Sequence, residues 1–210
     1  MDRYQASRSL KRAMDLIIGF CAAIVTAPLF IIIPLLLKLE GQKGSVFYGG
    51  IRIGQNGKKF KCWKFRSMEP DSDKLLEQYF LENPEERVNW ERYHKLKNDP
   101  RVSTLTAKII RKTSLDEIPQ LWNVFRGEMS LIGPRPILES EVKDYGNKIH
   151  YYTAAKPGIT GMWQVSGRNQ KTFEQRADLD AEYIQNWSMK NDIMILFKTV
   201  RVVLSGAGAS

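Results

Sequence analysis

The sequence has few of the residues that build disulfide frameworks or zinc sites. Its 210 residues include only two cysteines and two histidines. Cys21 lies in an apolar run and Cys62 in a basic segment, so nothing indicates a disulfide framework, and a reducing compartment is favoured. His94 and His150 stand alone in the sequence. This isolation argues against a histidine zinc site.

Charge is missing from one long stretch. Residues 16–37 read LIIGFCAAIVTAPLFIIIPLLL, without Asp, Glu, Lys or Arg. About 20 apolar residues are enough for one helical crossing of a bilayer. A cleaved signal peptide is disfavoured, because the run is long and no small-residue cleavage site follows it. The stretch therefore predicts a membrane segment.

Both flanks of this segment are basic. Arg3, Arg8, Lys11 and Arg12 precede it, and Lys38, Lys43, Arg52, Lys58, Lys59 and Lys61 follow it. Since Lys and Arg favour the cytoplasmic side, a helix that enters and returns to one face satisfies both flanks. Pro28, near the middle, lacks the N–H that an unbroken helix needs and marks the turning point. A straight anchor with a mild proline kink remains the alternative.

The rest of the chain carries a net charge of +9. Such a charge favours anionic partners, whether nucleic acid, acidic lipid or phosphorylated substrates, and composition does not choose among them. Asn56-Gly57 between two β-leaning runs predicts a type I′ hairpin over residues 45–68. Helices are expected at 73–82, 83–96, 172–187 and 191–204. The loops 127–136 and 156–169 contain so many glycines and prolines that we expect no regular structure there.

Adjacent acids mark the most interesting position. Asp116 and Glu117 are expected at a helix start, with either Ser114 or Asp116 as the cap. Capping alone explains such a pair, but basic residues and glycine-rich loops surround it. A carboxylate can attack phosphorus, and a neighbouring acid can hold Mg²⁺ together with substrate phosphates. The candidate cations for a diphosphate are Lys64, Arg66, Arg111, Arg135 and Arg168.

Several specific motifs occur in a fixed order over nearly the whole chain. They are Lys11-Arg12-x-x-Asp15, KFRSM (64–68), RKTSLDE (111–117), QLWNV (120–124), GPRP (133–136), KPGITG (156–161), QVSGRN (164–169) and Leu179-Asp180-x-x-Tyr183. Together they resemble the bacterial sugar transferase family, the monotopic polyprenyl-phosphate phosphoglycosyl transferases.

The resemblance implies an activity and roles for particular residues. The reaction would move a sugar 1-phosphate from a UDP-sugar to polyprenyl phosphate and release UMP, as the first membrane step of O-antigen, capsule or exopolysaccharide assembly. Asp116 would be the nucleophile and Glu117 would help bind Mg²⁺. Arg111 and Arg135 would contact phosphates or the nucleotide, Lys64 would line the site, and Asp180 matches a further acidic position of the family.

It also implies an α+β fold and a location. We expect a mainly helical monotopic membrane protein with a re-entrant N-terminal helix (1–40), a small β-hairpin, and a cytoplasmic catalytic domain with interfacial helices (41–210). The expected place is the bacterial inner membrane, with the active site on its cytoplasmic face. Membrane lipid is an expected partner and nucleic acid is not, because no nucleic-acid motif is present.

Two departures from the family pattern matter. Many relatives have Ser-Pro at the helix break, whereas this chain has Ala27-Pro28. The insert between Met68 and Arg111 resembles the larger hexose-1-phosphate transferases, which usually carry an extra N-terminal membrane region. The chain is therefore expected to be either a catalytic domain or a natural short form. A basic membrane scaffold and a nucleic-acid-binding protein are the non-catalytic alternatives. The sugar and the oligomeric state, a homodimer included, stay open.

Overall fold

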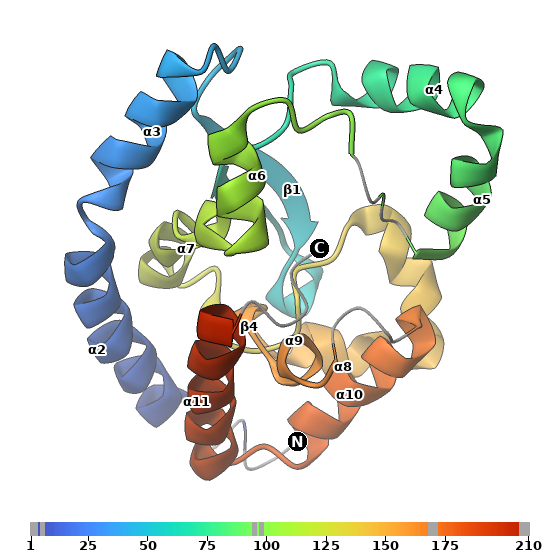
Figure 1. Ribbon diagram of the computed structural model, residues 1–210. Helices are drawn as coiled ribbons and strands as arrows, with labels where there is room; N and C mark the ends of the chain where they lie inside the picture. Colours follow the sequence, from blue (N-terminus) through green and yellow to red (C-terminus); the bar gives the residue numbers. More distant parts are fainter. Residues whose placement is uncertain (1–3, 5–6, 94–95, 97–98, 168–171, 206–210) are drawn as a thin grey trace.

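The computed structural model describes residues 4, 7–93, 96, 99–167 and 172–205, and Figure 1 shows how they are arranged. The α-helices are α2 (Arg8–Thr26), α3 (Leu29–Leu39), α4 (Ser72–Glu82), α5 (Pro84–Tyr93), α6 (Leu105–Lys112), α7 (Gln120–Arg126), α8 (Ile149–Ala154), α9 (Met162–Val165), α10 (Phe173–Gln185) and α11 (Met189–Ser205). The strands are β1 (Phe47–Ile53), β2 (Lys59–Phe65), β3 (Ser130–Ile132) and β4 (Gly158–Thr160), and the 3₁₀ segments are η1 (Gln55–Gly57), η2 (Leu115–Glu117) and η3 (Glu139–Lys148).

The predicted hairpin is confirmed. β1 and β2 pair antiparallel, from Phe47 opposite Phe65 to Ile53 opposite Lys59. Asn56 and Gly57 both have positive φ, 56° and 72°, as a type I′ turn requires. The mixed helix and strand class, with a small antiparallel sheet, is thus the one that the sequence predicts.

The apolar segment forms two helices with a bend between them. No described helix is long and apolar enough by itself to cross a membrane, but α2 and α3, bent by 48°, together have the length and composition of a broken span or a re-entrant loop. The break falls at Ala27-Pro28, because Pro28 cannot donate to the carbonyl of Ile24. That carbonyl accepts from the Ala27 amide instead, at 3.3 Å. Pro34 lies inside α3 without ending it.

The bent pair packs on the rest of the chain through one side (Figure 1). Ile33 and Leu37 of α3 are buried in a cluster with Phe65 and Ile110. In α2, the Asp15 carboxylate accepts hydrogen bonds of 3.0 Å from the Ser130 hydroxyl and the Leu131 amide. The opposite side carries exposed large apolar residues, which are Leu10, Leu16, Ile17, Phe20, Ile24, Val25, Phe30, Ile31, Ile32, Leu35, Leu36 and Leu39.

The glycine- and proline-rich loops contain more structure than predicted. β3 and β4, one from each loop, form a two-stranded parallel pair, and α9 follows β4. The expectation of irregular loops was wrong because glycine lets the two backbones meet. A Cβ atom on Gly133 would lie 2.4 Å from the Lys156 carbonyl oxygen, and one on Gly158 would lie 2.1 Å from the Gly133 nitrogen. This contact fixes the segment that carries Arg135.

Candidate active site

Asp116 and Glu117 lie in a tight connection between α6 and α7. α6 begins at the Thr104 cap, whose hydroxyl accepts a 3.1 Å hydrogen bond from the Ala107 amide. After α6, Ser114 adopts a left-handed conformation with φ of 58°, which turns the chain into η2. Ser114 makes no side-chain cap hydrogen bond, and Pro119 is the residue before α7. Ser114 therefore stands at the N-cap position of η2, as one of the two alternatives had it, but without a side-chain cap hydrogen bond, and the acid pair occupies a single 3₁₀ turn.

Lys64 brings the two carboxylates into one cluster. Its ammonium lies 2.7 Å from Glu117 Oε1 and 4.0 Å from Asp116 Oδ2. Lys64 comes from near the end of β2, which packs against η2. The three side chains are 23%, 12% and 11% exposed, respectively, so the charges interact in a partly dehydrated environment. Residues 53 positions apart thus form the centre of the site.

Arg135 approaches the same cluster from the loop that follows β3. Its NH1 atom lies 3.6 Å from Glu117 Oε1, and its guanidinium is 5.7 Å from the centre of the Trp163 ring. Trp163 follows β4, so the paired β3 and β4 loops place both side chains. A guanidinium held over a ring keeps its orientation and can offer its N–H groups to a phosphate.

The electrostatics of Asp116 are those of a buried acid among cations. Burial raises the pKa of the Asp116 carboxyl above its ordinary value, and the nearby Glu117 charge raises it further. The positive charges of Lys64, Arg111 and Arg135 act in the other direction, with Lys64 the strongest of them. A carboxylate with a raised pKa is more basic, and its oxygen is then a better nucleophile whenever it is ionised.

The other predicted residues have different outcomes. Arg111 is exposed at the end of α6, and its charge acts on Asp116. Arg66 donates to the Ser45 carbonyl at 2.6 Å and lies over Tyr48, so it braces the start of the hairpin and forms no described ion pair with the acids. Arg168 lies outside the described residues.

Asp180 lies apart from the acid pair. It is 2% exposed on α10, and its carboxylate accepts a 2.7 Å hydrogen bond from the Tyr145 hydroxyl. Arg176 is the cation that acts on it. The Arg176 guanidinium also lies 4.9 Å from the centre of the Trp163 ring, the same ring that the Arg135 guanidinium contacts. Among the described residues, Arg176 and Trp163 connect this buried carboxylate to Arg135 of the site.

Sequence reasoning missed the residue that joins the two halves of the site. Asn123 of α7 is fully buried, and its Oδ1 accepts a 3.0 Å hydrogen bond from the Trp63 amide. Its Nδ2 donates to the Lys61 carbonyl at 2.7 Å and to Glu128 at 2.6 Å. This side chain satisfies two groups on the open edge of β2, as a neighbouring strand would. The QLWNV motif was the available signal.

The donor set of the acid pair is compatible with Mg²⁺. Among the described residues, no group of three or more His, Cys, Asp and Glu side chains is placed to hold a metal ion. Mg²⁺ is usually held by one or two carboxylates and completes its shell with substrate phosphates and water. Asp116 and Glu117 supply two carboxylates beside one another, so they fit an ion that is shared with a diphosphate.

Taken together, these residues define a class of site. A partly buried carboxylate pair, one ammonium and two guanidinium groups can bind a phosphate-rich substrate and present an oxygen nucleophile to its phosphorus. The same residues lie beside a bent apolar helix pair. The arrangement is compatible with phosphoryl transfer.

The chain belongs to the bacterial sugar transferase family, whose sequence model matches residues 6–206. It is 47% identical over 205 residues to the undecaprenyl-phosphate galactose phosphotransferase of Salmonella typhimurium, with 98% of this chain and 42% of the relative aligned. It is 45% identical over 199 residues to the exopolysaccharide production protein ExoY of Rhizobium meliloti, with 95% and 87% aligned. It is also 50% identical over 204 residues to an uncharacterized sugar transferase of Haemophilus influenzae, with 97% and 43% aligned.

The relatives differ in length. The chain spans less than half of the Salmonella and Haemophilus proteins and most of ExoY. In each of these three comparisons, 95% or more of this chain is aligned.

Proposed function

We propose that this protein is a phosphoglycosyl transferase that moves a sugar 1-phosphate from a UDP-sugar to polyprenyl phosphate. The proposal is supported by one observation above all: Asp116 and Glu117 share a cluster with Lys64 and Arg135. The name of the Salmonella relative describes the same chemistry, because that protein transfers a galactose phosphate to undecaprenyl phosphate. The step would belong to the assembly of a surface polysaccharide.

In the first displacement, an Asp116 carboxylate oxygen attacks the phosphorus that carries the sugar. A bond forms between this oxygen and the phosphorus, and the bond to the oxygen that bridges the two phosphorus atoms breaks. UMP leaves with that electron pair. The product on the protein is an aspartyl sugar phosphate.

In the second displacement, a phosphate oxygen of polyprenyl phosphate attacks the same phosphorus. The bond to Asp116 breaks, and the carboxylate is regenerated with the electron pair. The lipid leaves as a polyprenyl diphosphate sugar. Two displacements at one carboxylate let the water-soluble donor product leave before the lipid reacts.

The neighbouring cations bind and neutralise the transferred group. Arg135 and Lys64 lie within reach of the acid pair, so phosphate oxygens that approach Asp116 enter their field. Arg111 adds charge from the exposed side. Glu117 would hold Mg²⁺ when the diphosphate is bound, and that ion would offset the charge that develops on the leaving phosphate.

The bent pair α2 and α3 would lie in the membrane and return to the cytoplasmic face of the bacterial inner membrane. Its exposed apolar side and the 48° bend support this arrangement. Residues 1–40 would form the membrane part and residues 41–210 the catalytic part. To test the topology, Ser7→Cys and Ser45→Cys are labelled separately in intact vesicles, in a chain whose Cys21 and Cys62 are replaced by serine. Labelling from one side is expected, whereas opposite sides would contradict the re-entrant form.

The direct test of the activity is the nucleotide that is released. The full chain is incubated with polyprenyl phosphate and, in turn, several UDP-sugars. Release of UMP with at least one sugar is expected, and release of UDP would indicate ordinary glycosyl transfer instead. Asp116→Asn should stop UMP release. Asp73→Asn, which changes an exposed acid of α4, is the matched control and should retain it.

A further inference from the structure

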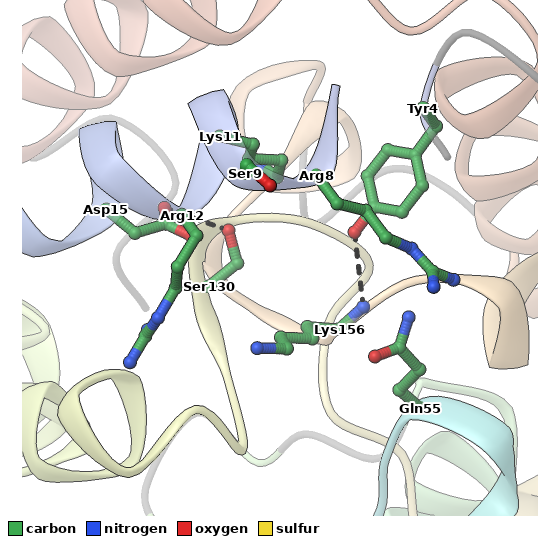
Figure 2. A pocket seen from close by; sticks show the side chains of 9 residues that line it. All are labelled: Tyr4, Arg8, Ser9, Lys11, Arg12, Asp15, Gln55, Ser130 and Lys156. Carbon is green, nitrogen blue, oxygen red and sulfur yellow. Dashed lines mark hydrogen bonds between the residues drawn. The ribbon is translucent and has the colours of Figure 1, made fainter. Parts of the chain in front are cut away.

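A basic cavity lies at the start of α2, and none of the residues in the acid-pair cluster lines it. Its volume is about 390 Å³, and Figure 2 shows the nine side chains around it. The lining comes from four separate places in the chain: the N-terminal segment with α2, the hairpin turn, β3 and the loop before β4. The mechanism proposed above does not use this cavity.

Positive charge dominates the lining. Arg8, Lys11, Arg12 and Lys156 all contribute, and Asp15 is the only acid among the described residues of the lining. Lys11 is already paired, because its ammonium lies 2.6 Å from Asp192. Three cations therefore remain against one carboxylate.

Arg8, Arg12 and Lys156 have no ion-pair partner among the residues that the structure describes. Arg12 donates to the carbonyl oxygens of Val124 and Phe125, at 2.6 and 3.0 Å, which fixes the guanidinium without neutralising it. A Cβ atom on Gly127 would lie 3.5 Å from the Lys156 ammonium and 3.7 Å from Arg12 NH2, so these two cations lie close together. Figure 2 shows Arg12 on one side of the Lys156 side chain and Arg8 with Gln55 on the other.

Neutral donors complete the lining. The Tyr4 hydroxyl and the Gln55 amide border the cavity beside Lys156. Tyr4 is held by a ring contact with Trp187, and Gln55 is held by a 2.9 Å hydrogen bond to the Ala154 carbonyl. Several cations with additional neutral donors around a cavity of this size are the pattern of a phosphate-binding pocket.

We propose that this pocket binds the phosphate of an anionic phospholipid headgroup. The lipid source rests on the membrane arrangement proposed above for α2 and α3. Leu10, Ile17 and Phe20 are 61%, 66% and 62% exposed on the helix that begins at the pocket. When Arg8, Arg12 and Lys156 hold the phosphate, the acyl chains of the lipid lie beside this apolar surface. The contact anchors the first turn of α2 at the depth of the lipid headgroups.

Lys156 gives the experiment a direct readout. Burial, with the nearby Arg12 and Arg8 charges, lowers the pKa of the Lys156 ammonium. A larger neutral fraction makes this amine reactive toward an acetylating N-hydroxysuccinimide ester, and a bound phosphate opposes that reaction by favouring the charged form and covering it. The full chain is reconstituted in phosphatidylcholine vesicles with or without phosphatidylglycerol, and acetylation is measured by peptide mass spectrometry.

The expected result is that phosphatidylglycerol lowers acetylation of Lys156 by about fivefold or more, as for a charge-assisted contact. Lys190, an exposed lysine outside the pocket, is the internal reference and should change little. Arg8→Gln should remove most of the protection of Lys156. Lys58→Gln, which removes one exposed positive charge elsewhere, should keep it.

Three results would overturn the proposal. Equal protection by vesicles that contain oleate, an anionic lipid without phosphate, would show a general effect of surface charge. Protection by inorganic phosphate in phosphatidylcholine vesicles, without any effect of phosphatidylglycerol, would rule out the lipid source. Unchanged protection in Arg8→Gln would show that the pocket does not hold the headgroup. UMP release is measured on the same vesicles, so a failure of transferase activity is distinguished from a failure of lipid binding.

Discussion

Replacing Asn123 with leucine should separate the two halves of the catalytic site. Leucine has nearly the same size, so the change removes hydrogen bonds and leaves little empty volume. The Trp63 amide and the Lys61 carbonyl of β2 would lose their partner on α7. Lys64 follows Trp63 directly, and its ammonium lies 2.7 Å from Glu117. Loosening the edge of β2 therefore moves the ammonium away from the acid pair.

The size of the effect follows from the groups left without a partner. Each of these two backbone groups costs about 1–3 kcal/mol when it is left without a hydrogen bond, so the free energy of unfolding should fall by about 2–6 kcal/mol. For a chain of this length, at about 2–4 °C per kcal/mol, that loss corresponds to a decrease in Tm of about 4–24 °C. Activity should also fall at temperatures where the variant is still folded.

Tm is measured by circular dichroism in detergent, and UMP release is measured well below the Tm of the variant. Asn186→Leu is the control, because Asn186 is exposed at the end of α10 and its side chain forms no hydrogen bond with the site residues that the structure describes. Equal Tm and equal activity in Asn123→Leu and Asn186→Leu would refute the role assigned to Asn123.

Three further predictions concern titration and metal. Burial and Glu117 raise the pKa of Asp116, so labelling of the protein by a UDP-sugar without polyprenyl phosphate should decline with falling pH at a pH above the ordinary aspartate value of 3.8. Glu117→Gln should move this decline to lower pH, and an unmoved decline would contradict the coupling between the two carboxyl groups. Burial raises the pKa of Asp180 to about 6, so its contribution to stability is complete below about pH 4 and is lost as the pH rises through 6. In urea unfolding, the free energy of unfolding of the wild type should therefore fall by about 3 kcal/mol relative to that of Asp180→Asn between about pH 4 and pH 7. Parallel pH profiles of the two proteins would refute a contribution from the raised pKa of Asp180. EDTA should abolish UMP release and Mg²⁺ should restore it, and full activity in EDTA would argue against a Mg²⁺ requirement.

The sequence was most informative where a local rule decides the structure. The hairpin follows from Asn56-Gly57, since these residues accept the positive φ that a tight turn needs. The break after α2 follows from Pro28, which has no N–H to donate. The acid pair and its cations could be proposed because their motifs occur in family order. Their side-chain roles stay predictions until they are tested by variants.

The rest depended on contacts between distant segments. Arg66 follows the end of β2, which lies beside the start of β1 and Ser45. Its position in the KFRSM motif therefore did not reveal its contact with the Ser45 carbonyl. The sequence singled out Asp180 only as a further acidic position of the family pattern, and it did not show that Tyr145 and the packing of α10 bury the carboxylate. The β3–β4 pair depends on contact between glycines 25 positions apart, Gly133 and Gly158, which no local pattern shows.

The central claim is that Asp116 carries the sugar phosphate during transfer. The most direct measurement is to incubate the full chain with a labelled UDP-sugar and no polyprenyl phosphate, and then to locate the label by peptide mass spectrometry. We expect a sugar phosphate on the peptide that contains Asp116, loss of this label on addition of polyprenyl phosphate, and no label in Asp116→Asn. A label on another residue, or near-normal turnover by Asp116→Asn, would contradict the account.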